Sequence, residues 1–287
     1  MKHLFLAILL IGFSMSHMVA QNPIVQSQKK DNMNRIERSK QTYEKLFKQV
    51  QSVSSSDDPE LMTILQRFIF GEIFYTGNLD DKTRELITIT ALATNQTLPQ
   101  LNAHTNAALN IGVEPITIRE IIYQLAPFIG YPKVLNALDT INSVFESRSI
   151  PLPLQNETTI ADSERFEKGK QIQYPLYGDG MKQNLKDMPG EFAEIIPRLL
   201  TESCFGDFYT RGGLDIKTRE LMIFCALASL GGTDRQMGSH AVGNMKVGND
   251  KETLVSAMVQ LYPYIGFPRI ANAIYAIKEA KLEKDVH

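Results

Sequence analysis

Tryptophan is absent from this chain of 287 residues, cysteine occurs only twice, and no dense run of lysine or arginine is present. The formal net charge of −2 gives no indication of a nucleic-acid partner, so none is predicted. The two cysteines, Cys204 and Cys225, could form one disulfide in an exported protein. Cys225 lies in the apolar stretch LMIFCALASL, which is typical of a small buried side chain, so the sequence leaves the pairing open.

A membrane-spanning segment is not indicated either, because the apolar run LFLAILLIGF at residues 4–13 is too short to cross a bilayer comfortably. This run follows a short polar start and precedes a polar stretch that ends in Met18-Val19-Ala20-Gln21. The pattern predicts a signal peptide at residues 1–20 that is cleaved after Ala20. We therefore expect an exported protein, periplasmic in a Gram-negative source, without stable membrane insertion after cleavage.

A long internal repeat is the most prominent feature of the chain. The octet LDDKTREL at residues 79–86 returns as LDIKTREL at residues 214–221, inside the longer matching segments FGEIFYTGNLDDKTREL and FGDFYTRGGLDIKTREL. Further along, APFIGYPKVLNAL is matched by YPYIGFPRIANAI. A repeat of this length indicates a duplicated domain rather than a solenoid. We predict a first domain at residues 33–148, a polar, proline-bearing linker at 149–163, and a second domain at 164–283.

Each copy carries start signals for helices. Asp80 and Asp215 precede KTREL and are predicted to accept hydrogen bonds from free backbone N–H groups at a helix start. Thr97 and Thr233 each begin a T-x-x-Q sequence, which predicts a capping box, and Thr117 begins a similar T-x-x-E sequence. No convincing alternation of period two, as in a strand, is present. The predicted fold is all-α, with two tandem helical lobes.

Stop signals and a buried face complete this prediction in the first copy. Gly112 is expected to close one helix, Pro127 to end or kink the next, and Pro132 to begin the last. The apolar residues of that last helix share one face: Val134, Leu138, Ile141 and Phe145.

Three polar residues recur in both copies within apolar helical sequence. An arginine can hold a carboxylate through two parallel hydrogen bonds, a histidine can exchange a proton near neutral pH, and a glutamate can orient the imidazole. A structural role is the simpler interpretation of each residue taken alone. One histidine and one glutamate per copy are a poor set of metal ligands, so neither a metal nor a cofactor is predicted. The candidate site residues are Arg84, Glu85 and His104, with counterparts Arg219, Glu220 and His240.

These residues lie in motifs that resemble the carboxymuconolactone decarboxylase family. The motifs are LD-x-KTREL, the following histidine, Gly112, the IREII segment and IGYP-x-x-x-NA, and the resemblance covers residues 60–147 and 195–280. It implies an all-α fold of the alkylhydroperoxidase D type that assembles into trimers or hexamers. A doubled chain is then expected to form a homo-oligomer, as three chains that mimic a hexamer.

Two branches of this family imply different chemistry. The alkylhydroperoxidase D branch carries E-x11-C-x2-C-x3-H, and here Glu85 and His104 have that spacing, but Thr97 and Gln100 stand at the cysteine positions. The second copy likewise has T-x-x-Q. Without a thiolate this chemistry has no nucleophile, so a peroxidase-type oxidoreductase is the weaker alternative.

The other branch is a cofactor-free decarboxylase, and it leads to our main hypothesis. We expect a lyase that acts on a small anionic, carboxylated and lactone-type substrate. Arg84 would bind a carboxylate, His104 would transfer a proton, and Glu85 would hold His104. The first copy has Glu120 in its IREII segment where the second copy has Ser256, which favours the first copy as the more active one. A non-catalytic binding or assembly module is the third alternative.

Overall fold

The computed structural model describes residues 33–50, 52 and 56–282, so the predicted signal peptide lies outside the described residues. Residues from Arg35 onward form one compact unit. Within the described ranges every regular element is a helix, which confirms the predicted all-α class. None of these helices is long and apolar enough to cross a membrane.

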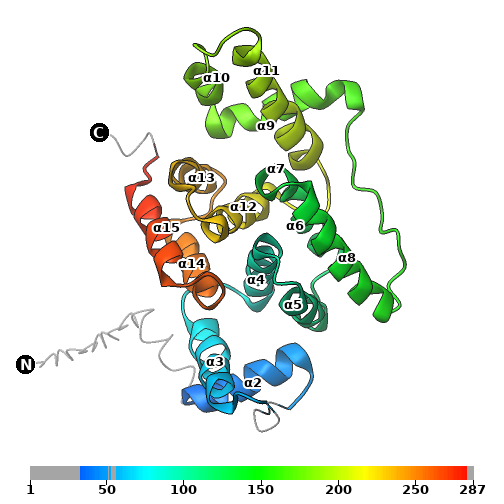
Figure 1. Ribbon diagram of the computed structural model, residues 1–287, viewed down its shortest axis with the longest axis vertical. Helices are drawn as coiled ribbons and strands as arrows, with labels where there is room; N and C mark the ends of the chain where they lie inside the picture. The colour runs from blue at the N-terminus through cyan, green and yellow to red at the C-terminus, as the bar shows by residue number, and fades with distance from the viewer. Residues whose placement is uncertain (1–32, 51, 53–55, 283–287) are drawn as a thin grey trace, which may run out of the picture. The chain divides into compact units, whose positions relative to one another are not determined.

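The described residues of the first copy form seven α-helices, labelled in Figure 1, and one short 3₁₀ helix. They are α2 (Arg35–Phe47), α3 (Pro59–Gly71), η1 (Ile73–Tyr75), α4 (Asp81–Asn95), α5 (Leu98–Asn110), α6 (Pro115–Gln124), α7 (Ala126–Ile129) and α8 (Tyr131–Ser147).

The second copy repeats most of this order, with a π-helix before its central helix. Its elements are η2 (Asp162–Glu164), α9 (Arg165–Tyr177), α10 (Gly180–Asn184), α11 (Phe192–Leu199), η3 (Leu200–Tyr209), α12 (Ile216–Leu230), α13 (Asp234–Lys246), α14 (Lys251–Ile265) and α15 (Phe267–Glu279).

The repeated octet begins the central helix of each copy, as predicted. Asp80 accepts a hydrogen bond from the backbone N–H of Thr83 at 2.8 Å, and Asp215 accepts one from Thr218 at 2.9 Å. Each bond satisfies a backbone donor that the first turn of a helix leaves unpaired. The octet therefore recurs partly because it starts α4 and α12.

Thr97 and Thr233 do not form the predicted capping boxes. Both threonines directly precede a helix, but neither side chain caps it. The hydroxyl of Thr97 donates back to the carbonyl of Leu92 at 3.4 Å, and that of Thr233 donates to Leu227 at 2.8 Å. A hydroxyl can pair with the end of the preceding helix as readily as with the start of the next one.

The proline and glycine signals of the first copy fall where the helices change. Gly112 follows α5 with a φ of +80°, the left-handed conformation that glycine adopts most readily. Pro127 lies just after the break between α6 and α7, and Pro132 is the second residue of α8. The predicted start at Thr117 is wrong by two residues, because α6 begins at Pro115.

The two copies share one hydrophobic core. Helices α4 and α12 pack against each other, and each also contacts helices of the other copy, such as α14 against α4 and α6 against α12 (Figure 1). Ile87 and Ile89 on α4, and Met222 and Phe224 on α12, have no exposed surface. Burial of these faces is the main driving force for the association of the two copies.

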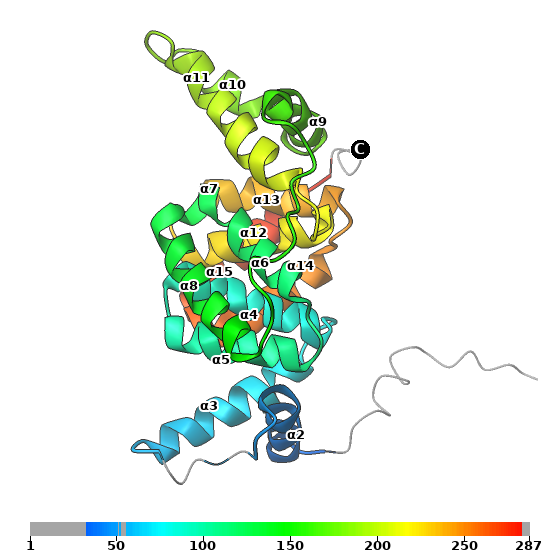
Figure 2. The ribbon, with the colours of Figure 1, turned by 90° about the vertical axis from the view of Figure 1, so that its right-hand side faces the viewer.

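A helix pair flanks this core in each copy, α2 with α3 in the first and α9 with η3 in the second (Figure 2). Arg35 pairs with Glu72, and at the matching positions Arg165 pairs with Asp207 at 2.6 Å. Gly71 keeps the first pair close, because a Cβ there would lie 2.2 Å from a backbone oxygen of α2. The matching ion pairs show which residues of the two copies correspond to each other.

Candidate functional site

Glu85 and His104 meet in the interior of the first copy. Glu85 lies in the second turn of α4 and is fully buried, and its Oε2 is 2.8 Å from Nδ1 of His104 on α5. With Glu85 as a carboxylate, which can only accept, Nδ1 is the donor and Nε2 remains to exchange a proton with a ligand. The second carboxylate oxygen, Oε1, is buried without a hydrogen-bond partner among the described residues. The structure thus brings together two of the three predicted residues.

A cavity of about 880 Å³ opens beside His104. Thr97 and Gln100, which stand at the cysteine positions of the thiol branch, are among its lining residues, so these positions do face the site. The rest of the lining has more apolar than polar surface and comes mainly from α2, α3, α4, α5 and the end of α14. Its main apolar members are Phe47, Met62, Leu65, Ile69, Phe70 and Leu92.

Two lining residues, Pro263 and Tyr264, come from the second copy. The ring of Tyr264 meets the ring of His104 edge to face, with centroids 5.7 Å apart. Its hydroxyl is buried behind the cavity wall, beside Glu85 and Thr88. Burial and the neighbouring charge of Glu85 raise the pKa of Tyr264, so the phenol stays protonated. The second copy therefore supplies part of the wall of the first site.

In the second copy, neighbouring side chains satisfy both carboxylate oxygens of the matching pair, and we call this pair closed in that sense; the His240 side chain itself is 12% exposed, against 9% for His104. Nδ1 of His240 is 3.2 Å from Oε2 of Glu220, and the hydroxyl of Tyr177 reaches both, at 2.7 and 2.5 Å. Tyr209 donates to the other oxygen, Oε1, at 2.5 Å. Every oxygen of this carboxylate is paired, whereas the Glu85 carboxylate keeps one unpaired oxygen.

The two sites differ in which of their aromatic residues carry a hydroxyl group. Tyr177 and Tyr209 of the second copy correspond to Phe47 and Phe74 of the first, so the first site lacks the two hydroxyls that close the second. Gly243 completes this closure, because a Cβ at that position would lie 2.6 Å from the hydroxyl oxygen of Tyr177. None of these residues was predicted to belong to a site, although an alignment of the two copies shows the differences.

Arg84, the third predicted residue, is not among the residues that line the cavity. It is fully enclosed, and burial lowers its pKa. Its guanidinium donates at 3.0 Å to Oε1 of Gln260, a residue of the second copy. It also donates to three backbone carbonyls, those of Ile73, Thr76 and Leu79. The geometry makes Arg84 a connection between the copies, not a carboxylate ligand.

Arg219 makes the reciprocal connection. It donates to Oε1 of Gln124, in the first copy, at 3.3 Å, and to the carbonyls of Arg211 and Gly212. Burial lowers its pKa to about 10. The two arginines of the repeated octet therefore hold the copies together across the shared core, which is a structural reason for the octet to occur twice.

Glu120 lies at this contact as well. It is fully buried, accepts two hydrogen bonds from Arg211 at 2.7 and 2.9 Å, and accepts another from Arg119 at 2.9 Å. On the reciprocal side, Ser256 accepts a hydrogen bond from the backbone N–H of Asn78 at 3.3 Å. Glu120 does not line the cavity, so the difference between Glu120 and Ser256 concerns the contact between copies.

Among the described residues that line the cavity, Arg148 is the one with an arginine or lysine side chain, and it was not one of the predicted site residues. Its Nε and Nη2 donate to the Oδ1 atoms of Asn106 and Asn110, at 2.7 and 2.8 Å. These contacts hold the exposed guanidinium at the rim of the cavity. No motif marked this residue, which lies at the end of α8.

The two cysteines are both buried and unpaired, so the structure contains no disulfide between them. Burial raises the pKa of Cys204 and of Cys225, and the charge of Glu220 adds to the effect at Cys204. A buried, protonated thiol is a poor nucleophile. The thiol chemistry of the alkylhydroperoxidase D branch finds no support in these residues.

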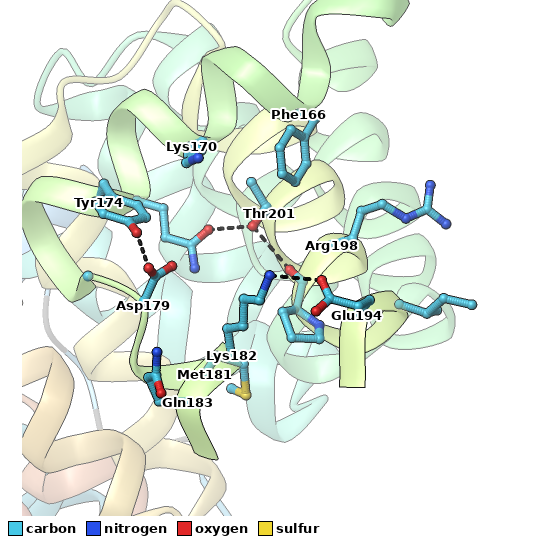
Figure 3. Close-up of a pocket in the computed structure, with 14 residues that line it drawn as sticks. Phe166, Lys170, Tyr174, Asp179, Met181, Lys182, Gln183, Glu194, Arg198 and Thr201 are labelled. Atoms are coloured by element: carbon cyan, nitrogen blue, oxygen red, sulfur yellow. Dashed lines mark hydrogen bonds and ion pairs between the residues drawn. The ribbon is translucent and has the colours of Figure 1, made fainter. Parts of the chain in front are cut away.

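A second hollow, of about 360 Å³, lies beside α9, α10 and α11 (Figure 3). Six of its polar side chains form three pairs: Lys182 with Glu194 at 2.9 Å, Tyr174 with Asp179, and Thr201 with Gln173. Neither residue of the second Glu–His pair lines it.

The fold and the two centres define a duplicated all-α protein with one open and one closed Glu–His pair. The model of the carboxymuconolactone decarboxylase family matches residues 59–142 and 196–279, which together are more than half of the chain. The chain belongs to the carboxymuconolactone decarboxylase family.

Two curated relatives match single stretches of the chain. One is the "Uncharacterized 15.0 kDa protein in nqo9-nqo10 intergenic region" of Paracoccus denitrificans, 38% identical over 78 residues, or 26% of this chain and 58% of the relative. The other is "Nitrosuccinic acid decarboxylase npaB" of Metarhizium robertsii, 27% identical over 94 residues, or 31% of this chain and 66% of the relative. The chain thus spans less than two thirds of the length of either relative.

Proposed function

We propose that the first copy acts as a cofactor-free lyase that removes carbon dioxide from a small carboxylated substrate. The observation that carries this proposal is the open Glu85–His104 pair beside the cavity. The matching pair of the second copy is satisfied internally, so the second copy serves as a partner for folding and for the site. The name of the relative from Metarhizium robertsii, a decarboxylase of nitrosuccinic acid, supports the same reaction class.

Arg148, rather than Arg84, would bind the carboxylate of the substrate. It lies at the rim of the cavity, and its three hydrogen bonds use Nε and Nη2, which leaves the Nη1 amino group for a substrate carboxylate. A guanidinium holds a carboxylate through directed, charge-assisted hydrogen bonds. The apolar lining would exclude water around the rest of the substrate, which strengthens these interactions.

The reaction itself needs one bond cleavage and one proton transfer. The bond between the carboxylate carbon and its neighbouring carbon breaks, carbon dioxide leaves, and the electron pair moves onto the adjacent carbonyl or nitro group. His104, protonated at Nε2, gives its proton to the carbanionic carbon and regains one from solvent. Glu85 holds Nδ1 and stabilises the imidazolium before the transfer. Substrate and one proton are thereby converted to product and carbon dioxide.

Carbon dioxide release is the direct test, with γ-carboxymuconolactone and nitrosuccinic acid as the two substrates offered. We expect the wild type to release carbon dioxide from at least one of them. His104→Gln and Glu85→Gln should lower kcat by about 100-fold or more, the usual contribution of a positioned general acid. His240→Gln is the matched control and should retain activity. Failure of the wild type on both substrates would contradict the proposal and favour a binding role.

A further inference from the structure

A buried glutamine lies in the wall that α3 contributes to the cavity. Gln66 is 4% exposed and lines the cavity, with Met62 and Phe70 one turn before and one turn after it on the same face of the helix. Its backbone carbonyl accepts a hydrogen bond from Ser39 at 2.9 Å, but its side-chain amide makes no hydrogen bond with any described residue. A buried amide without a partner is uncommon, because its removal from water is unfavourable unless a hydrogen bond compensates for it.

The amide of Gln66 has access to the cavity. The described side-chain atoms that are both fully enclosed and unpaired include Oε1 of Glu85 but neither amide atom of Gln66. The amide is unpaired, so its atoms keep some accessible surface, and the space beside Gln66 is the cavity. A ligand in the cavity can therefore reach this donor and this acceptor.

The corresponding position of the second copy has a partner. Gln66 corresponds to Thr201, whose hydroxyl donates to Oε1 of Gln173 at 2.6 Å and to the carbonyl of Pro197 at 3.0 Å (Figure 3). Gln173 in turn corresponds to Tyr43 of α2, and among the described residues no hydrogen bond joins Tyr43 to Gln66. The second copy thus completes this polar contact between its flanking helices, whereas the first copy leaves an amide for a ligand.

Two aromatic rings lie along the wall between Gln66 and His104. Phe70 packs edge to face against Phe47, with centroids 5.6 Å apart, and Phe47 packs in the same way against His104, also at 5.6 Å. All four residues line the cavity. A molecule that contacts both Gln66 and His104 therefore extends along these rings and needs an apolar body between its polar ends.

We propose that Gln66 is a substrate-binding residue whose amide forms a hydrogen bond with a neutral oxygen, a hydroxyl or a carbonyl, on the part of the substrate farthest from His104. This inference rests on the proposed function and narrows its substrate class to a carboxylate with an apolar body that carries such an oxygen. An amide has two N–H donors and a carbonyl acceptor, so it pairs with a hydroxyl as well as with a carbonyl. A substrate without this oxygen would leave the amide unpaired, and sites of this kind discriminate against such analogues.

Calorimetric titration with 4-hydroxyphenylacetate and phenylacetate tests the assignment. The two ligands share a carboxylate and an aromatic ring and differ in one hydroxyl, on the far side of the ring from the carboxylate. We expect the wild type to bind 4-hydroxyphenylacetate about 5-fold more tightly than phenylacetate, and Gln66→Leu to bind the two equally. Thr201→Val, at the matching position of the second copy, is the control and should keep the preference. A wild type without the preference, or a Gln66→Leu variant that keeps it, would overturn the inference.

Turnover separates this inference from the proposed function. With γ-carboxymuconolactone, whose ring carries a carbonyl, Gln66→Leu should raise KM about 5-fold and leave kcat within about 2-fold, because the amide binds the ground state and the transition state alike. An unchanged KM beside an active wild type would overturn the role of Gln66 and leave the proposed function intact. A wild type that releases no carbon dioxide would contradict the proposed function, and the calorimetric comparison would still decide the binding role.

Thermal unfolding distinguishes a binding role from a structural one. Gln66→Leu removes an amide without a partner and should melt no lower than the wild type. Thr201→Val removes two hydrogen bonds and should melt about 2–4 °C lower. A Gln66→Leu variant that melts below the wild type would show that the amide stabilises the fold and would overturn the binding assignment.

Discussion

Removal of one hydroxyl, by Tyr209→Phe, should destabilise the protein although the cavity lies in the other copy. The hydroxyl of Tyr209 donates to Oε1 of Glu220 at 2.5 Å, and Glu220 is fully buried. Tyr177 and His240 both contact the other oxygen, Oε2. The substitution therefore leaves Oε1 buried without a partner among the described residues.

The size of the effect follows from the charge and burial of that oxygen. A buried acceptor that loses its partner costs about 1–3 kcal/mol, and more when the group is charged, so we expect a loss of about 2–3 kcal/mol. Packing should change little, because the phenylalanine ring occupies the same volume. Phe74→Tyr makes the reverse change in the first copy, where Oε1 of Glu85 is already unpaired, and should not destabilise the protein.

Urea unfolding followed by circular dichroism measures both variants against the wild type. Tyr209→Phe should lower the midpoint with an unchanged slope, which indicates lost stability without a change in the exposed surface. If Tyr209→Phe were as stable as the wild type, the argument that paired oxygens stabilise the closed centre would be refuted. If Phe74→Tyr lowered the free energy of unfolding more than Tyr209→Phe, the assignment of the centre with both carboxylate oxygens paired to the second copy would be contradicted.

Three further predictions concern the closed copy and the buried groups. Gly243→Ala should lose about 1–3 kcal/mol in the same urea assay, because its Cβ would lie 2.6 Å from the hydroxyl of Tyr177; an unchanged midpoint would contradict this packing. Cys204 and Cys225 should not react with a thiol-reactive disulfide reagent until the protein unfolds, since burial raises the pKa of both thiols, and rapid reaction of the native protein would revive the thiol branch. Tyr177 and Tyr264 have raised pKa values, so folding favours their protonated forms: their contribution to stability is full below the unfolded pKa of about 10 and is lost as the pH rises above it. Phenolate absorbance should accordingly appear for these two residues only as the protein unfolds, and early titration of all tyrosines would refute it.

The local signals in the sequence predicted the helices well. Asp80 and Asp215 cap the helices that they were expected to cap, and Gly112 and Pro132 lie where one helix ends and another begins. These features depend on a few neighbouring residues, so the sequence contains the information that they need. Thr97 failed because its hydroxyl had two backbone partners within reach, and a sequence pattern does not choose between them.

The contact between two of the candidate site residues was predicted. Glu85 and His104 are connected by a spacing within two adjacent helices, and the structure brings them together. Arg84 carried the same signal of recurrence in both copies, but its neighbours are backbone carbonyls and Gln260, which only the three-dimensional packing reveals. A residue that recurs in both copies of a duplicated chain can be one that holds the copies together or one that performs chemistry. Recurrence alone does not distinguish the two.

The lining residues that were not predicted are far from Glu85 and His104 in the sequence. Tyr264 reaches the first site from the second copy, and Arg148 reaches its rim from the end of α8. An alignment of the two copies does contain a signal, since Phe47 corresponds to Tyr177 and Phe128 corresponds to Tyr264. Its meaning becomes clear only when the structure shows that the hydroxyls lie at the two centres.

The most direct test of the division between an open and a closed copy is a crystal structure of the His104→Gln variant soaked with γ-carboxymuconolactone or nitrosuccinic acid. The variant should bind the substrate without turning it over. The account predicts one substrate molecule per chain, in the cavity between residue 104 and Tyr264, with its carboxylate toward Arg148. A substrate molecule beside His240, or one at each centre, would contradict it.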